Sequence, residues 1–264
     1  MSRKPKLGQN FLVDAAAASA IVEALGEISD QTVLEIGPGT GAITEILAPR
    51  ARRLIAVELD AVLAPDLKER YRQTPSVEVI EEDILRVDLS QLPAPGEKIQ
   101  VVGNLPYYLT SDILLHLFAN HASISRAVVM MQREVAERVA AIPGTRDYGL
   151  LSATAQLHAR VDTLLTLPPS AFSPPPDVHS TVLRLTMRPR WEELGVDREA
   201  FTGFLKRIFA QKRKTLSNNL RNSGYEAATI ASGLAKAGVP AQVRAEALSL
   251  EDASRVYREL SREV

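Results

Sequence analysis

Through roughly the first 190 residues, short runs of aliphatic and β-branched side chains alternate with stretches whose apolar positions recur at helical spacing. This alternation is typical of a parallel α/β sheet. Helices are expected after Asp14, Gly41 and Asp60 and, further on, at 111–119, 133–141 and 150–159. The expected strands are Thr32–Ile36, Leu54–Val57, Val77–Ile80, Ile99–Gly103, Ala127–Met131, Val161–Leu167 and Thr181–Met187.

The pattern changes after Met187. Pro189 and the stretch Trp191–Glu193 predict a linker, and from Arg198 onward helical periodicity replaces the β-rich runs. The sequence therefore predicts two domains, an α/β domain over residues 1–189 and a small helical domain over residues 190–264.

The composition, 45% hydrophobic and 24% charged over 264 residues, is that of an ordinary globular protein. The absence of cysteine excludes disulfides, a thiolate zinc site and a cysteine nucleophile. No apolar run approaches the roughly 18–20 residues that span a bilayer, and Asp14 interrupts any apolar signal core near the basic N-terminus. We expect a cytoplasmic protein without a membrane partner.

Charge is distributed unevenly along the chain, although the formal net charge is −1. Residues 1–100 hold 11 basic and 16 acidic side chains, whereas residues 188–264 hold 14 basic and 10 acidic ones. The total argues against a polycation that coats nucleic acid, but the C-terminal excess indicates a local anionic partner.

A glycine-rich turn follows the first expected strand, where residues 35–41 read Glu-Ile-Gly-Pro-Gly-Thr-Gly. Gly37, Gly39 and Gly41 allow a tight turn and a close approach of the backbone to a ligand. A plain turn without a ligand is one alternative. A dinucleotide site is another, but its fingerprint is G-x-G-x-x-G, and Glu35 would repel the pyrophosphate. The acid favours a cationic ligand instead.

Three polar residues stand where successive strands are expected to end: Glu58, Asp83 and Asn104. Ligands of open parallel sheets bind beyond the carboxyl ends of the strands, so these side chains are expected to converge on one crevice. A carboxylate at Glu58 suits ribose hydroxyls, and Asp83 is placed to accept from an adenine amino group. Each residue alone is typical of a solvated charge, but the ordered set behind a glycine turn predicts a site.

This set resembles the class I S-adenosylmethionine methyltransferases. The resemblance implies an α/β fold, a Rossmann-like seven-stranded methyltransferase sheet, mostly parallel with an antiparallel final hairpin, beside a small all-α C-terminal domain. It also implies S-adenosylmethionine as cofactor, with the glycine turn against the methionine part, Glu58 on the ribose and Asp83 on the adenine. The cofactor-binding residues so implied are Glu35, Gly37, Gly39, Gly41, Glu58, Leu59, Asp83, Ile84 and Asn104.

The motif Asn104-Leu105-Pro106-Tyr107 follows the fourth expected strand. A Pro-Tyr turn packed for stability is the plain alternative. Beside a methyl donor, the side-chain carbonyl of Asn104 and a backbone carbonyl of the loop suit the two N–H groups of an aromatic amine such as adenine N6. Tyr107 supplies a face for stacking on the base, and the proline stiffens the loop. The main contribution to catalysis is then positioning, after extrusion of a base that is paired or enclosed.

Three motifs together resemble the ribosomal RNA adenine N6-dimethyltransferases over essentially the whole chain. They are residues 8–12 (Gly-Gln-Asn-Phe-Leu), residues 104–107, and residues 172–180 (Phe-Ser-Pro-Pro-Pro-Asp-Val-His-Ser). The resemblance implies that Gln9, Asn10 and Leu12 close over the methyl donor. It also implies that Phe172 caps the target adenine opposite Tyr107. A core position for Phe172 is the plain alternative, but the three prolines that follow it favour a rigid exposed loop.

One departure is visible, because the family often has asparagine where this chain has Tyr108. A backbone role at that position survives the change, and a side-chain role does not. The catalytic set expected from the resemblance is Asn104, Leu105, Pro106, Tyr107 and Phe172.

Residues 206–222 contain six basic side chains and no acid. A solvated helix face is the plain interpretation, but six uncompensated positive charges favour an anionic partner, here the RNA backbone. The expected RNA-binding residues are Lys206, Arg207, Lys212, Arg213, Lys214 and Arg221.

The resemblance therefore implies an enzyme that dimethylates N6 of adenines in small-subunit ribosomal RNA, with immature small subunits as partner. Two alternatives stay open: a related enzyme that acts on large-subunit RNA and confers antibiotic resistance, and a non-catalytic ribosome-assembly factor. A nicotinamide dehydrogenase does not fit the glycine spacing. The four histidines show no metal-ligand spacing, so no metal is expected, and we expect a monomer.

Overall fold

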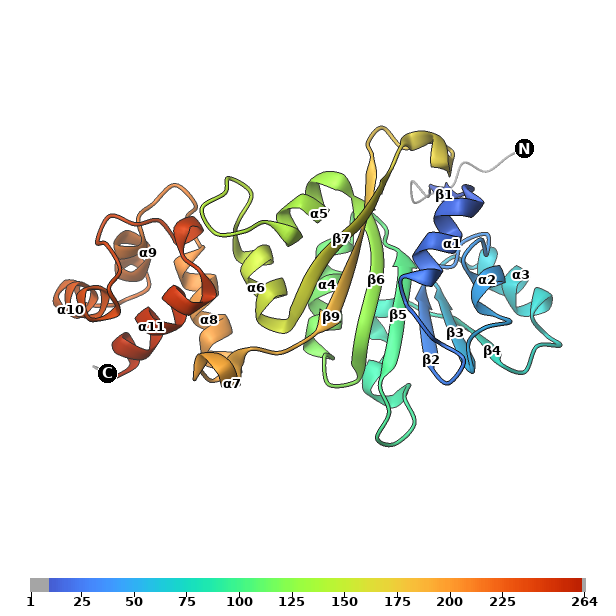
Figure 1. Ribbon diagram of the computed structural model, residues 1–264, viewed down its shortest axis with the longest axis horizontal. Coiled ribbons are helices and arrows are strands. Elements are labelled where there is room, and N and C mark those ends of the chain that lie inside the picture. The colour runs from blue at the N-terminus through green and yellow to red at the C-terminus, as the bar shows by residue number, and fades with distance from the viewer. Residues whose placement is uncertain (1–9, 263–264) are drawn as a thin grey trace. The chain divides into compact units, whose positions relative to one another are not determined.

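The computed structural model describes residues 10–262, which fall into two compact units (Figure 1). The first unit holds the chain up to Ala136 together with Val161–Met187. The second holds Glu137–Arg160 and the chain from Arg188 onward. The chain passes from the first unit to the second twice, between Ala136 and Glu137 and between Met187 and Arg188. The domain boundary expected at residue 189 lies near the second of these crossings, and the sequence does not anticipate that residues 137–160 group with the C-terminal helices.

The first unit is built on a seven-stranded sheet with the order β4-β3-β2-β5-β6-β9-β7. The pairs β2–β3, β3–β4, β2–β5 and β5–β6 are parallel, and β6–β9 is antiparallel. The α/β fold class with a mostly parallel sheet is therefore confirmed. The strands are β2 Thr32–Ile36, β3 Arg53–Glu58, β4 Val77–Glu81, β5 Ile99–Asn104, β6 Ile124–Gln132, β7 Ala159–Leu167 and β9 Ser180–Met187.

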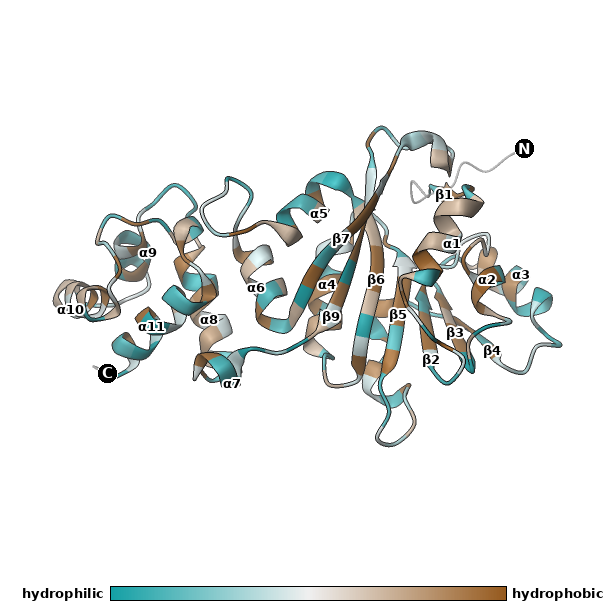
Figure 2. Cartoon of the chain, viewed as in Figure 1, coloured by the Kyte–Doolittle hydropathy of each residue, from teal (hydrophilic) through white to brown (hydrophobic). Residues whose placement is uncertain are grey.

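The central strands are apolar because both of their faces are covered, as expected of a parallel sheet. Every residue of β2 is buried, and in β3 only Arg53 is exposed. Figure 2 shows these strands largely in brown, while β7 carries both brown and teal segments, in keeping with its partly exposed position at the sheet edge. The uniform burial of β2 means that Glu35, the next-to-last residue of the strand, is a buried acid.

Helices and short 3₁₀ turns connect the strands of this unit. The segment after the glycine turn forms only one helical turn, Thr44–Leu47, which is shorter than the sequence predicts. The helices are α1 Ala15–Glu23, α2 Thr44–Leu47, α3 Leu63–Arg70 and α4 Thr110–Ala119, and the 3₁₀ turns are η1 Ile84–Arg86, η2 Leu89–Gln91 and η3 Pro169–Ala171. Helix α5, Arg133–Ala140, begins in this unit and ends in the second. Asp14 caps α1 as expected, accepting from the backbone N–H of Ala17 at 3.0 Å.

A separate two-stranded sheet joins two motifs that are far apart in the sequence. Strand β1 (Phe11–Leu12) pairs antiparallel with β8 (Phe172–Ser173), so that Leu12 lies opposite Phe172. Both side chains are buried, with 5% and 3% of their surface exposed, and both belong to the apolar core of this unit. The pairing explains how residues near the N-terminus reach the proline-rich segment.

The second unit is a helical cluster around its own core. Its helices are α6 Leu150–His158, α7 Trp191–Leu194, α8 Arg198–Ile208, α9 Leu216–Asn222, α10 Ala227–Ala237 and α11 Leu250–Ser261, with the 3₁₀ turn η4 Ala245–Ala247. Phe201, Phe204 and Tyr257 meet in its centre, with ring centroids 5.4–6.1 Å apart. Residues of α6 belong to this core, which is why the segment before β7 groups with the helices.

Candidate active site

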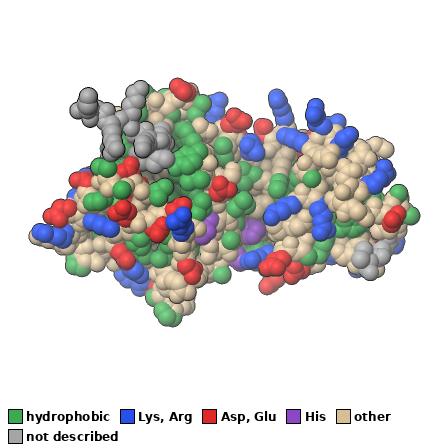
Figure 3. Space-filling view, turned by 180° about the vertical axis from the view of Figure 1, so that it is seen from behind, with side chains coloured by type: hydrophobic (Ala, Val, Ile, Leu, Met, Phe, Trp, Pro, Cys, Tyr) green, Lys and Arg blue, Asp and Glu red, His purple; other side chains and the backbone are tan. Residues whose placement is uncertain are grey.

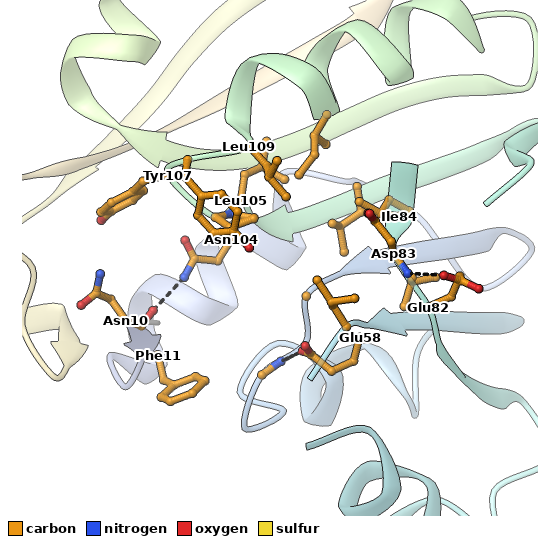
Figure 4. Close-up of a pocket in the computed structure, with 18 residues that line it drawn as sticks. Asn10, Phe11, Glu58, Glu82, Asp83, Ile84, Asn104, Leu105, Tyr107 and Leu109 are labelled. Atoms are coloured by element: carbon orange, nitrogen blue, oxygen red, sulfur yellow. Dashed lines mark hydrogen bonds between the residues drawn. The ribbon is translucent and has the colours of Figure 1, made fainter. Parts of the chain in front are cut away.

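A cavity of about 330 Å³ opens at the carboxyl ends of β2, β3 and β5 (Figure 4). These strands are parallel neighbours in the sheet, which brings the residues that follow them to one edge. Figure 4 shows Asn10, Asn104 and Tyr107 at one end of the cavity, and Glu58, Asp83 and Ile84 at the other. The convergence expected from the strand ends is therefore observed. The cavity is lined by Asn10, Phe11, Ile36, Gly37, Gly39, Val57, Glu58, Leu59, Glu82, Asp83, Ile84, Asn104, Leu105, Pro106, Tyr107, Tyr108, Leu109 and Ile113.

The glycine turn contributes backbone rather than side chains. Gly37 and Gly39 line the cavity and have φ values of +63° and +59°, a region that favours glycine. A Cβ on Gly39 would lie 2.8 Å from the ring of Phe11, so the turn also needs glycine to make room for that ring. Gly41 instead packs beneath Arg70 and does not line the cavity. Its expected contact with the cofactor stays a prediction.

Glu58 is fixed in place at the end of β3 by the backbone. Its side chain is 4% exposed, its Oε2 accepts from the N–H of Gly39 at 2.9 Å, and its Oε1 accepts from the N–H of Asp60 at 2.9 Å. Each carboxylate oxygen retains capacity for a further hydrogen bond. The carboxylate is therefore preorganised to accept from hydroxyl groups in the cavity.

Glu35 lies deeper, at 1% exposure, where the hydroxyl of Thr44 donates to its Oε2 at 2.7 Å. Burial raises the pKa of this carboxyl to about 8, with the negative charge of Glu58 adding to the rise and the hydrogen bond from Thr44 opposing it. It borders a small cavity of about 30 Å³ together with Gly37 and Gly39. A cation placed there would favour the ionised form.

Asp83 and its neighbours form the floor at the end of β4. Asp83 caps η1 by accepting from the N–H of Leu85 at 3.0 Å through Oδ1, while Glu82 accepts from the N–H of Asp83 at 2.8 Å. Ile84 is buried and Leu59 is 47% exposed at the rim. This end of the cavity thus combines carboxylate acceptors with apolar surface.

The geometry of the Asn104 loop defines which of its atoms face the cavity. The side-chain amide of Asn104 donates from Nδ2 to the backbone carbonyl of Asn10 at 3.0 Å. Because that carbonyl only accepts, the NH₂ group must lie there, and the remaining Oδ1 is the atom left to accept from a ligand. The N–H of Leu105 donates to the carbonyl of Met130 at 2.9 Å, which ties the loop to β6.

The rest of the loop is held by helix α4. The carbonyl of Pro106 accepts from the backbone N–H of Leu109 at 3.1 Å and from the hydroxyl of Thr110 at 3.0 Å. This carbonyl is therefore engaged at the start of the helix, and the carbonyl of Leu105 is the better candidate acceptor for a ligand. The half-buried ring of Tyr107 lines the cavity beside Asn104 (Figure 4).

One sequence-based expectation needs correction. Phe172 was expected on an exposed loop, but it is 3% exposed and packs in the core opposite Leu12, because burial of its apolar ring is favourable and the pairing with β1 brings the ring into the core. It does not line the main cavity, so the structure does not place it opposite Tyr107. Leu12 is likewise a core residue beside the small cavity, and Gln9 lies outside the described residues.

Several cavity residues were not predicted. Phe11 belongs to the motif at residues 8–12. Its ring packs against Gly39, where the missing Cβ leaves room for it, and a glycine at this position is the one sequence signal for such a neighbour. Tyr108 is 56% exposed at the rim, so its side chain is open to a ligand. Their neighbours Glu82, Leu109 and Ile113 follow motifs but carry no distinctive pattern of their own.

The basic segment lies on the second unit, where Figure 3 shows lysine and arginine side chains projecting from the surface. All six of its cations are exposed. Lys212 donates from Nζ to the backbone carbonyl of Arg146 at 2.7 Å. The buried side chain of Asn219 donates to the carbonyls of Ile208 and Gln211, at 2.9 and 3.2 Å, and so shapes the turn between α8 and α9. Lys212, Arg213 and Lys214 are thus carried on a defined turn, while Lys206 and Arg207 lie on α8 and Arg221 lies on α9.

Two absences hold for the part of the chain that the structure describes. Within residues 10–262, no helix is both long and apolar enough to cross a bilayer. Over the same range, no three histidine, aspartate or glutamate side chains come together in an arrangement that could hold a metal ion.

The fold and the cavity together are those of a methyltransferase. The sheet is Rossmann-like, carboxylates stand at neighbouring strand ends, and the glycine turn and the Asn-Leu-Pro-Tyr loop line one cavity. Comparison with known families narrows the class: residues 1–262 match the model of the ribosomal RNA adenine dimethylase family. The chain belongs to this family.

Relatives agree with this assignment. The chain is 67% identical to the ribosomal RNA small subunit methyltransferase A of Acidobacterium capsulatum, over 97% of this chain and 91% of that protein. It is 41% identical to the protein of the same name from Staphylococcus haemolyticus, over 97% and 89%. Among solved structures, a dimethyladenosine transferase from Plasmodium falciparum shares the fold at a TM-score of 0.81 and 24% identity, covering 96% of this chain and 98% of that one. The 23S rRNA methyltransferase ErmE matches at a TM-score of 0.72 and 27% identity, covering 96% and 100%.

Proposed function

We propose that this protein transfers methyl groups from S-adenosylmethionine to N6 of two adjacent adenines in a hairpin of small-subunit (16S) ribosomal RNA, giving N6,N6-dimethyladenosine during ribosome biogenesis. The observation that carries the proposal is the orientation of Asn104, whose Oδ1 is left free at one end of a cavity that carries the buried carboxylate of Glu58 at the other. Family membership over residues 1–262 supports the reaction, and relatives that are 41–67% identical support the small-subunit substrate.

The residues of the cavity fit S-adenosylmethionine chemically. Glu58 offers carboxylate oxygens for ribose hydroxyls, and Asp83 and Ile84 frame the adenine end. The backbone of Gly37 and Gly39 lines the cavity, with its two N–H groups donating to Val57 and Glu58. Glu35 lies nearby as a buried acid that a cationic amino group would ionise. When bound, the donor supplies an electrophilic methyl group on a positively charged sulfur.

The protein's own contribution is to orient the target amine. Oδ1 of Asn104 accepts one N6–H, and the carbonyl of Leu105 accepts the other, so the nitrogen lone pair is drawn out of conjugation and directed at the methyl group. Tyr107 stacks on the base and holds its plane. The methylated nitrogen is acidic enough to release its proton to solvent, so no strong base is required.

The second unit supplies affinity for RNA in this proposal. Its exposed cations Lys206, Arg207, Arg213, Lys214 and Arg221 contact backbone phosphates, and Lys212 does so while it tethers the turn. The protein acts as a cytoplasmic monomer.

The test is to incubate the protein with labelled S-adenosylmethionine and, separately, with immature small and large ribosomal subunits, and then to map the methylated base. We expect dimethyladenosine at two adjacent positions of small-subunit RNA only, and none with Asn104→Ala. Transfer to large-subunit RNA alone would favour the resistance enzymes. No transfer to either would favour a non-catalytic assembly factor.

A further inference from the structure

The end of the proline-rich motif has no role in the reaction described so far. Ser180, its last residue, begins strand β9 and is fully buried, with 0% of its surface exposed. Its small side chain adds little apolar contact, and a buried hydroxyl is costly unless it finds a hydrogen-bond partner. What this hydroxyl binds therefore indicates why a serine stands there.

The partner of Ser180 is the phenol of Tyr107. The two hydroxyl oxygens lie 2.9 Å apart, although 73 residues separate them in the sequence. The sheet register creates the contact: Asn104 of β5 pairs with Met130 of β6, and β6 continues to Gln132, which lies opposite Ser180 of β9. The residue that begins β9 is thus carried to the loop that ends β5.

This hydrogen bond fixes the side-chain ring of Tyr107, which the backbone contacts of the loop leave free to rotate. The loop itself is held by the bond from Leu105 to β6 and by the bond from Thr110 to Pro106. A tyrosine ring still turns about two side-chain torsions. A hydrogen bond at the far end of the ring restricts both torsions, and it does so from a rigid, fully buried position on the sheet.

We propose that Ser180 is a positioning residue for methyl transfer: its hydroxyl holds the ring of Tyr107 at the angle at which the target adenine stacks with N6 facing Asn104. The inference rests on the proposed function, in which Tyr107 supplies that face. Ser180 itself touches neither the donor nor the base. Its loss therefore affects the alignment of the amine, and hence the rate of transfer, more than the binding of either substrate.

The contact can be broken from either side, which provides the test. Ser180→Ala removes the hydroxyl on the sheet, and Tyr107→Phe removes the phenol but keeps the stacking face. We expect each variant to lower the single-turnover rate of methyl transfer roughly three- to tenfold, the scale of one hydrogen bond. Affinity for S-adenosylmethionine should change less than about twofold. The double variant should be no slower than the slower single variant, because both changes remove the same bond.

Two further variants separate positioning from general loss of stability. Ser180→Thr retains a hydroxyl and should restore most of the rate. Ser125→Ala removes another hydroxyl from the same sheet, one that donates to the carbonyl of Ile99 at 3.1 Å near the start of β5. It should lower the melting temperature about as much as Ser180→Ala while leaving the rate unchanged.

The outcomes distinguish this inference from the proposed function. An active wild type with additive losses in the double variant, or with an unchanged rate in Ser180→Ala, would overturn the positioning role. If Ser180→Ala does not fold, Tyr107→Phe tests the positioning role by itself. A rate of methyl transfer in Tyr107→Phe equal to that of the wild type would also overturn the positioning role. An inactive wild type on every RNA would overturn the proposed function instead.

Discussion

The two units of this protein differ in the sign of their charge and in how they hold it. The sheet unit carries 14 basic and 20 acidic residues, and the helical unit carries 17 basic and 12 acidic ones. In the sheet unit the important acids are buried at strand ends, as with Glu35 and Glu58. In the helical unit the cations of the basic segment are exposed.

This difference follows from what each unit is proposed to bind. A buried carboxylate is held rigidly and acts at short range, which suits a small ligand with defined donors and a positive charge. Exposed cations on a surface act through a screened field and tolerate many backbone conformations, which suits a long polyanion. Variants in the sheet unit should therefore change the rate of methyl transfer or the affinity for the donor. Variants in the helical unit should change the affinity for RNA and its salt dependence.

The largest effect is expected from Asn104→Ala. Loss of the acceptor that aligns the amine should lower the single-turnover rate about 100-fold or more, while the dissociation constants for the donor and for RNA stay within about twofold. Rapid-quench measurements with labelled donor and isothermal titration would check both. The control is Asn120→Ala, which removes an asparagine side chain at the C-terminal end of α4 and should leave the rate unchanged. Equal loss of donor binding would remove Asn104 from its assigned role.

Donor binding itself should depend on Glu58. Glu58→Gln removes the charge from an acceptor that the backbone of Gly39 orients, and we expect donor affinity to fall about 10- to 100-fold. RNA affinity should be unaffected. Glu81→Gln provides a matched control, because Glu81 lies opposite Glu58 in the register but is exposed. If both substitutions weaken donor binding alike, the effect is one of bulk charge.

RNA affinity should respond to the helical unit. The double substitution Arg213→Gln and Lys214→Gln should weaken RNA binding about tenfold near 0.1 M salt and reduce the slope of log affinity against log salt by nearly 2. Donor affinity should not change. Lys68→Gln with Lys98→Gln removes two exposed cations from the sheet unit as a control. An unchanged salt slope in the Arg213 and Lys214 variant would contradict the contact.

The smallest effect expected is the pH dependence contributed by Glu35. Burial raises the pKa of this carboxyl from 4.5 to about 8, so the folded state binds a proton that the unfolded chain has already released. The stability this proton contributes is full below about pH 4.5 and is lost as pH rises through 8. Without donor, the melting temperature should fall over this range by a few degrees more than in Glu35→Gln.

A cationic donor should reverse the preference, because its positive charge stabilises the ionised carboxylate. Donor affinity should therefore rise severalfold between pH 6.5 and 8.5 in the wild type and stay nearly flat in Glu35→Gln. Titration calorimetry in buffers of different ionisation enthalpy would detect the released proton. A wild-type affinity that does not change with pH would show that no cation lies near Glu35.

Much of the fold could be predicted because its signals are local. Strand β2 was predicted with the observed bounds, and β5 and β6 within a few residues, since runs of β-branched residues flanked by turn residues reveal buried strands. The site acids Glu58 and Asp83 were predicted from the rule that ligands lie at the carboxyl ends of parallel strands. The length of helix α2 was overestimated. The apolar residues continue at helical spacing past Leu47, but Pro49 cannot donate the next backbone hydrogen bond and the helix ends before it.

The errors concern residues whose neighbours are distant in the sequence. Phe172 was expected to be exposed because three prolines follow it, yet its pairing with Leu12 buries it in the core. The grouping of residues 137–160 with the C-terminal helices depends on packing between α6 and the helical core, for which the local pattern carries no signal.

The sequence by itself determined the order of strands and helices, the placement of acids behind strands and the concentration of positive charge near the C-terminus, since these depend on residue type and spacing. The tertiary structure decided which atoms face the cavity. The amide of Asn104 is oriented by Asn10, and the ring of Tyr107 is held by Ser180, through contacts that span 94 and 73 residues. Such contacts arise because the pairing of strands brings distant segments of the chain together. Which atom of a side chain donates and which accepts is decided only when both partners are in place.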